Sequence, residues 1–213
     1  KGGVVTLDMG PNWNPQEGPI GSLAEAQVNQ VKAIKAALSN AASGAAKPKR
    51  LKRADSFLGV HFDFHAGHDC TEIGKNTTRE MIENIINQIH PDYLQIDCKG
   101  HPGLSSYPTK AGNQAPGFVG DPLRLWREVT AEHGVALYMH YSGVWDSEAI
   151  RQHPDWAVIN ADGSTNVNAT SFFSPYADQL LITQLRELAG DYGVDGAWVD
   201  GECWASQPDY GDA

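Results

Sequence analysis

The chain has 213 residues, of which 41% are hydrophobic and 20% are charged, with 22 glycines and 12 prolines. This composition excludes a mainly disordered chain, because enough apolar side chains are present to build a sizeable core. The net charge of −10 opposes nonspecific binding to nucleic acids and to anionic membrane surfaces. No apolar run approaches the roughly 18 residues that cross a bilayer. We therefore predict no nucleic-acid or membrane partner and expect a neutral or cationic small ligand.

The sequence also lacks the common signatures of cofactor sites. Cys70, Cys98 and Cys203 have spacings that match neither a zinc motif nor a disulfide framework. No glycine-rich dinucleotide fingerprint follows the first strand of a βαβ unit, and no P-loop motif occurs anywhere. We predict no cofactor. The sequence does not fix the compartment, and we favour a secreted or periplasmic location.

The N-terminal part predicts one strand-loop-helix unit. Residues 3–9 have the pattern of a short strand, and a loop rich in glycine, proline and asparagine follows. Ser22 is a candidate N-cap that Glu25 completes to a capping box, and helical periodicity continues to Leu38. Residues 39–53 are small and then basic, with neither helical nor strand periodicity, which predicts a linker.

From residue 54 onward, predicted strands and helices alternate. The patterns predict strands over 57–64, 93–97, 135–141 and 196–199, helices over 78–89, 121–133 and 175–192, and a hairpin turn at Asp162-Gly163. Such alternation is typical of parallel βα units. Right-handed crossovers bring the carboxyl ends of all parallel strands to one edge, where barrels and open α/β sheets carry their chemistry.

Polar side chains gather at these predicted strand ends. They are Asp8; His61, Asp63, His65 and His68; Asp97, Lys99 and His101; Tyr138, His140 and Tyr141; and Asp200 and Glu202. A single polar strand end is usually structural, but here five separate units contribute to one rim. We therefore predict a functional site along that rim.

Asp200 is the strongest single candidate. It follows an apolar strand, and the period of two places Trp198 on the same side. Gly201 removes a side chain where a substrate would approach. A carboxylate beside an aromatic surface is typical of a glycosidase nucleophile, because the ring stacks on the sugar while the carboxylate reaches the anomeric carbon. The structural alternative is an aspartate that caps a helix or binds a backbone turn.

A metal site is the competing interpretation of the histidines. His61, Asp63 and His65 alternate along one strand face, and Asp97 and His101 could join them. Histidines on a strand can equally hydrogen-bond sugar hydroxyls, and no second His/Asp pair completes a familiar metal pattern. We predict no metal and keep a metal-dependent hydrolase as an alternative.

The C-terminal motifs resemble the α-L-fucosidases of glycoside hydrolase family 29. In that family a helix reads roughly Y...QL.EL...YG and is followed by a strand ending W.DGE. The matching residues here are Tyr176, Gln184-Leu185, Glu187-Leu188, Tyr192-Gly193, Trp198 and Asp200-Gly201-Glu202. The resemblance implies that Asp200 is the catalytic nucleophile and that Trp198 belongs to the sugar pocket.

Three further segments resemble the same family less sharply. Phe64-His65-Ala66-Gly67 is similar to F-I-H-W-G, and residues 99–103 are similar to K-H-H-D-G without its first His and its Asp. Residues 134–142 are similar to the third unit, with His140 in place of its first Tyr and Tyr141 matching its second. The resemblance implies that His65, His101, His140 and Tyr141 bind substrate.

The order of the units is unusual. Residues 1–38 resemble the last βα unit of the fucosidase barrel, residues 39–53 form the linker, and residues 54–213 resemble the first to fourth units. The resemblance implies an α/β fold of the (β/α)8 TIM-barrel type with about five of its eight βα units in this chain. A closed barrel of this type takes about 250 residues. Another chain or a further segment would complete it.

The function implied by the resemblance is that of an exo-acting, retaining glycosidase that cleaves a terminal α-L-fucose-like sugar from a carbohydrate. Its acid/base carboxylate is expected outside this sequence, because the family uses a later unit for it and does not use the residue matching Glu202. Two alternatives stay open. One is a carbohydrate-binding or catalytically incomplete barrel fragment, and the other is the metal-dependent hydrolase.

Overall fold

The computed structural model describes residues 55–200 and 208–211 continuously, together with residues 5–8 and individual positions between 12 and 32. The predicted linker 39–53, Glu202 and Cys203 lie outside the described residues. Residues 25, 28, 29, 31 and 32 are helical, as the N-terminal pattern predicts. None of the helices in the described part of the chain combines the length and the apolar character needed to span a bilayer.

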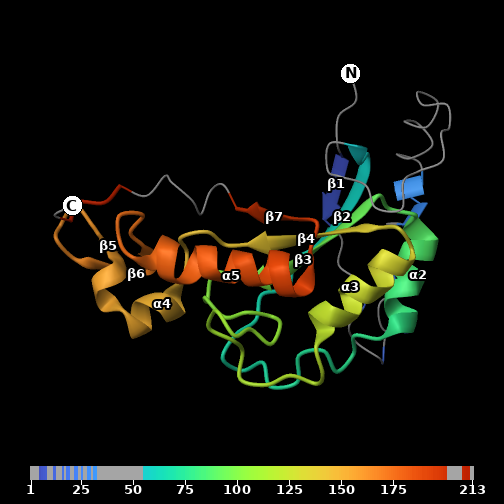
Figure 1. The fold of residues 1–213 in the computed structure, drawn as a ribbon, viewed down its shortest axis with the longest axis horizontal. Coiled ribbons are helices and arrows are strands. Elements are labelled where there is room, and N and C mark those ends of the chain that lie inside the picture. The colour runs from blue at the N-terminus through green and yellow to red at the C-terminus, as the bar shows by residue number, and fades with distance from the viewer. Residues whose placement is uncertain are drawn as a thin grey trace.

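One parallel sheet organises the molecule (Figure 1). Its five strands are adjacent in the order β1 (Val5–Asp8), β2 (Leu58–Phe62), β3 (Tyr93–Lys99), β4 (Ala136–Tyr141) and β7 (Gly196–Val199). Every neighbouring pair is parallel, which confirms the predicted α/β class. Within the described residues β1 and β7 are the sheet edges, so no closed barrel is seen.

Helices cover one side of this sheet (Figure 1). Helix α2 (Arg79–Ile89) begins where Thr78 accepts a hydrogen bond from the Met81 amide, and α3 (Pro122–Glu132) begins at the Asp121 cap with proline in its first turn. Their apolar faces pack against the outward side chains of the strands, such as Ile96. Each buried Leu or Ile side chain contributes about 1.5–3 kcal/mol, so this layer holds the strands in place.

The last helical stretch differs from the single amphipathic helix predicted over 175–192. Regular α-helix is confined to α5 (Ile182–Glu187), and π-helical turns flank it at Ala177–Leu181 and Leu188–Tyr192. Each π turn adds a residue to the helical repeat, so the buried face rotates along the stretch. The helix ends at Gly193, whose φ of 65° is in the left-handed region that favours glycine.

The segment between β4 and α5 was predicted to be irregular apart from its turn. The hairpin is confirmed: β5 (Ala157–Ile159) and β6 (Thr165–Thr170) pair antiparallel around Gly163. The prediction missed α4 (Ser147–Gln152), which has only six residues and therefore no clear periodicity. Its cap, Asp146, accepts a hydrogen bond from the Ala149 amide at 2.8 Å.

The face of the sheet opposite the helices has a small aromatic core near the amino ends of the strands. Tyr93, Ala136 and Tyr138 form this buried cluster, and the rings of the two tyrosines lie 5.2 Å apart. A Cβ at Gly59 would come within 1.9 Å of the Tyr93 ring, so this close approach requires glycine. Towards the carboxyl ends, the same face changes from apolar to polar side chains.

Candidate active site

The strand register brings the polar side chains of neighbouring strands together. Asp97 on β3 is the register partner of His140 on β4, and His140 is the partner of Trp198 on β7. On the other side, His61 of β2 is paired with Gln95 of β3 and its ring contacts that side chain at 2.6 Å. Part of the predicted rim of polar strand ends, namely His61, Asp97 and His140, therefore comes together at the carboxyl edge of the sheet.

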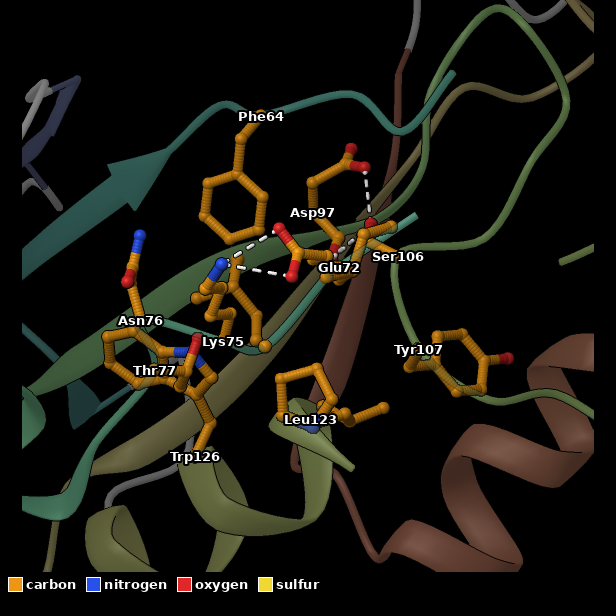
Figure 2. A pocket seen from close by; sticks show the side chains of 14 residues that line it. Phe64, Glu72, Lys75, Asn76, Thr77, Asp97, Ser106, Tyr107, Leu123 and Trp126 are labelled. Carbon is orange, nitrogen blue, oxygen red and sulfur yellow. Dashed lines mark hydrogen bonds and ion pairs between the residues drawn. The ribbon is translucent and has the colours of Figure 1, made fainter. Parts of the chain in front are cut away.

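A buried carboxylate-imidazole pair lies at the centre of this rim. Asp97 Oδ1 is 2.8 Å from His140 Nδ1, and both side chains are almost completely buried. Ser106 donates a hydrogen bond to Asp97 Oδ2 at 3.0 Å (Figure 2). Because the Asp97 carboxylate accepts a hydrogen bond from Nδ1, the imidazole of His140 is oriented with Nε2 towards Asp200. The distance from His140 Nε2 to Asp200 Oδ2 is 3.5 Å. Asp97 thus sets the position and the ring orientation of His140.

Opposing effects act on the pKa of His140. Burial lowers it, but the hydrogen bonds to Asp97 and Asp200 and the negative charges of Asp97 and Asp63 raise it by more, so the net shift is upward. The imidazolium form is therefore stabilised between two carboxylates.

This shift predicts a pH-dependent stability. Because the folded pKa of His140 exceeds the unfolded value of about 6.5, its contribution to the free energy of unfolding is complete below about pH 6.5. It is lost as the pH rises through the folded pKa. Urea denaturation of the wild type and of His140→Gln, in buffer with a chelator, should show their largest stability difference at the acidic end. A difference that grows with rising pH would contradict the assignment.

Asp200 lies where the sequence places it, directly after β7. Its amide donates to the Tyr141 carbonyl at 2.9 Å, and its side chain is 13% exposed. Trp198 is 44% exposed, and its ring centroid lies 5.2 Å from that of His140 and 5.6 Å from that of His61. A carboxylate and an open indole face therefore lie on the same side of the sheet edge.

His65 and His101 extend this arrangement beyond the strands. His65 Nε2 is 2.8 Å from Asp63 Oδ1 and 3.7 Å from Asp97 Oδ1, and its ring stacks on His140 at 5.7 Å. The His101 ring lies 5.2 Å from that of His65. Burial first, and then the charge of His65, lowers the pKa of His101, so its neutral form is favoured.

A close backbone approach fixes the position of His65. A Cβ at Gly100 would come within 2.3 Å of His65 Cγ, so the chain after β3 reaches the histidine only with glycine there. Gly100 lies in the segment that resembles K-H-H-D-G, where its family counterpart is a histidine.

Tyr141 does not join this group. Its side chain is fully buried on the helix side of β4, and its hydroxyl donates to Gln184 Oε1 at 2.9 Å. Lys99 lies on the same side, with its Nζ 4.7 Å from the Tyr141 ring centroid and 3.0 Å from Asp146 Oδ2. The β3–β4 register shifts between Asp97 and Lys99, and such a bulge turns Lys99 away from the face that carries Asp97. The structure therefore gives no support to a substrate contact by Tyr141.

Two residues of this region were absent from the predicted set of substrate and catalytic residues. Asp97 was predicted only as a member of the polar rim and as a possible metal ligand, although it organises His140. Trp145, three residues beyond Ser142, has its ring centroid 5.2 Å from that of His101, and its carbonyl accepts from Lys99 at 3.1 Å. Trp145 could have been predicted from the sequence, because it is an aromatic residue that follows soon after a predicted strand end.

Part of the cluster has the composition of a metal site. One ligand atom each from Asp63, His65, Asp97 and His140 lies within 4.8 Å of all the others. Two His nitrogens and two carboxylate oxygens are ligand types that Zn²⁺ accepts. His61, which belonged to the predicted metal face, is instead engaged with Gln95.

A cavity of about 280 Å³ lies beside this group, between the ends of β2 and β3 and the first turn of α3. Figure 2 shows Phe64 and Trp126 along its apolar lining, with the Glu72–Lys75 ion pair nearby. Asp97 and Ser106 are both part of its wall. The contacts of Asp97 with Ser106 and His140 therefore belong to one buried network.

Comparisons with known proteins support the likeness of the fold. No protein-family model and no curated protein matches the chain. Among solved structures, α-L-fucosidase isoenzyme 2 from Paenibacillus thiaminolyticus matches with a TM-score of 0.58 and 24% identity over 67% of this chain. Two further solved structures match. An α-L-fucosidase from Vibrio sp. strain EJY3 matches with a TM-score of 0.47 and 18% identity over 64% of this chain. A hypothetical protein from Ruminiclostridium thermocellum ATCC 27405 matches with a TM-score of 0.48 and 14% identity over 61% of this chain.

The matched part is a fraction of the enzyme. It covers 23% of the Paenibacillus fucosidase and 24% of the Vibrio fucosidase, against 73% of the Ruminiclostridium protein. At this level of identity the similarity concerns the fold. The resemblance that the sequence motifs indicate is thereby confirmed: the chain folds as a partial α-L-fucosidase-like domain.

Proposed function

We propose that this chain carries the nucleophile side of an exo-acting, retaining glycosidase site that cleaves a terminal α-L-fucose-like sugar. The observation that carries the proposal is the position of Asp200. Its carboxylate follows a parallel strand at the carboxyl edge of the sheet, beside the exposed Trp198 and 3.5 Å from His140 Nε2. The similarity of the fold to an α-L-fucosidase supports the substrate class.

In the proposed reaction, an Asp200 oxygen attacks the anomeric carbon as the bond to the leaving oxygen breaks. A second carboxylic acid protonates that oxygen, and the resulting carboxylate then activates the water that releases the sugar from Asp200. Retaining enzymes hold these two carboxyl groups about 5 Å apart. We place the acid/base outside this chain, in a later barrel unit.

The remaining side chains of the cluster bind the sugar. The Trp198 indole offers an apolar surface for the ring, and His65 and His101 offer nitrogen atoms to its hydroxyls, while the buried His140 positions the Asp200 carboxylate. Asp97 keeps His140 in one orientation, which preserves the direction of Nε2 during the reaction. Tyr141 has no direct part, because Gln184 and the core enclose it.

We also propose that the five parallel strands are the eighth and the first four strands of a (β/α)8 barrel. The pairing of β1 with β2 supports this order, because the eighth and first strands are neighbours in such a barrel. Three further βα units, from another chain or a further segment, would close it between β7 and β1.

Hydrolysis of an aryl α-L-fucoside tests the proposed activity. We expect release of fucose whose first-formed anomer, followed by proton NMR before mutarotation, is the α anomer. Formation of the β anomer would contradict a retaining mechanism. Binding of fucose without any turnover in the complete protein would instead establish the carbohydrate-binding alternative.

A metal-dependent hydrolase is the second candidate, because Asp63, His65, Asp97 and His140 bring four ligand atoms within 4.8 Å of one another. The two candidates differ in their response to a chelator. The glycosidase proposal predicts that dialysis against EDTA leaves aryl fucoside hydrolysis unchanged within about twofold, since its chemistry needs only carboxylates. Loss of activity on EDTA treatment, followed by recovery with Zn²⁺, would favour the metal-dependent hydrolase.

A further inference from the structure

A groove with a volume of about 570 Å³ lies next to the candidate active site, and His101 lines both. The other side chains that matter for its chemistry are His68, Glu148, Ile150, Arg151 and Val167. Its size falls within the roughly 300–1,000 Å³ of typical small-molecule sites. Because the His101 ring also lies 5.2 Å from that of His65, this histidine stands between the groove and the cluster.

The walls of the groove are fixed to the segment that carries His101. The amide of Ser147 donates to the His101 carbonyl at 3.3 Å, and that of Glu148 donates to the Pro102 carbonyl at 3.1 Å. The first turn of α4 is therefore tied to the loop after β3. A ligand in the groove and a sugar at the cluster would be held in a constant relation to each other.

The polar groups of the groove provide both donors and acceptors. Arg151 Nη2 lies 2.6 Å from Glu148 Oε1, and Arg151 Nε lies 2.8 Å from Glu148 Oε2. His68 Nε2 lies 3.3 Å from Glu148 Oε2. The hydrogen bond from Arg151 lowers the pKa of Glu148 against the opposing effect of burial, so the acid stays ionised. An adjacent carboxylate and guanidinium suit neighbouring hydroxyls, which both donate and accept.

The groove also has an apolar part. Ile150 and Val167 contribute branched aliphatic side chains, and Val167 is 66% exposed on the hairpin strand β6. One apolar surface opposite a few directional polar groups matches a pyranose ring, which has C–H faces and a hydroxyl rim. The net electroneutrality of the Glu148–Arg151 pair favours an uncharged sugar over a charged one.

We propose that this groove is the leaving-group subsite, which binds the neutral sugar from which the terminal sugar is cleaved. The inference rests on the proposed glycosidase function and deepens it. The groove would make the enzyme selective for glycan substrates over simple glycosides. Its residues would contribute to cleavage of a disaccharide and leave cleavage of an aryl glycoside nearly unchanged.

Two variants test the groove by different means. Arg151→Ala removes the guanidinium, and Val167→Trp fills the groove from an exposed position that tolerates a larger side chain. For both we expect the ratio of kcat/KM for α-L-fucosyl-galactose to that for an aryl α-L-fucoside to fall about tenfold, as for loss of one hydrogen bond to a charged group. The aryl value itself should change less than about twofold. Arg186→Ala, an exposed arginine on α5, is the matched control and should leave the ratio unchanged.

Binding of free galactose to the protein, followed by NMR at the amides of residues 147–151, gives a readout without turnover. Chemical-shift changes that galactose causes in the wild type but not in Val167→Trp would support sugar binding in the groove, even if no substrate is hydrolysed. In that case only the proposed glycosidase activity fails. Hydrolysis with an unchanged ratio in both variants overturns the groove and leaves the glycosidase proposal standing. The absence of both hydrolysis and shifts overturns both.

Discussion

Replacement of Asp200 by glycine is expected to lower hydrolysis of an aryl α-L-fucoside by a factor on the order of 10⁴ or more, as for removal of a covalent nucleophile. Among the residues that the structure describes, the contact of this carboxylate is with His140 at 3.5 Å, and we expect the fold to survive the change. Added azide should restore part of the rate. It fills the space of the lost side chain and attacks the anomeric carbon from the same face.

The product of this rescue is diagnostic, because attack by azide opposite to the leaving group yields the β-fucosyl azide. Asp191→Asn, an exposed aspartate before β7, is the control and should neither lose activity nor respond to azide. A fully active Asp200→Gly variant would contradict the nucleophile assignment. A large loss without any azide product would leave Asp200 as a structural residue and would also count against it.

The second large effect concerns the buried ion pair of Lys99 and Asp146. Their side chains are 1% and 0% exposed, and Lys99 Nζ lies 3.0 Å from Asp146 Oδ2. Lys99→Met should lower the free energy of unfolding by about 3–5 kcal/mol, because it leaves a buried carboxylate without its cation. Chemical denaturation of the variant beside the wild type measures this loss.

Removing both charges should recover most of the stability. In the double variant Lys99→Met with Asp146→Asn, the asparagine oxygen can still accept from Ala149, and no unpaired charge is buried. The exposed pair Lys75–Glu72 provides the control, since Lys75→Met should change stability little. Equal losses in Lys99→Met and in the double variant would show that the ion pair is not the source of the effect.

Much of the fold follows from local patterns. The alternation of apolar strands and amphipathic helices predicts a parallel sheet, and the Asp121-Pro122 helix start is confirmed at α3. The sheet order that joins β1 to β2 is a long-range feature, and only the resemblance to a barrel suggested it. The position of Asp200 directly after a strand was predictable because the apolar strand Gly196–Val199 ends just before it in the sequence.

Other features depend on contacts that no local pattern reveals. The bulge between Asp97 and Lys99 interrupts the period of two, so the face of Lys99 could not be read from its spacing. Tyr141 was assigned to the sugar by motif position, whereas Gln184, 43 residues later in the chain, holds it on the helix side. The link from Ser106 through Asp97 to His140 joins three segments and becomes visible only in the folded chain.

The assignment of Asp200 as a covalent nucleophile is tested most directly by trapping the intermediate. Incubation of the complete protein with a 2-deoxy-2-fluoro-α-L-fucosyl donor carrying an activated leaving group should inactivate it. Peptide mass spectrometry should then place one fluorofucosyl group on Asp200. A label on another carboxylate, or hydrolysis of the donor by an inverting route with no labelled peptide, would contradict the account.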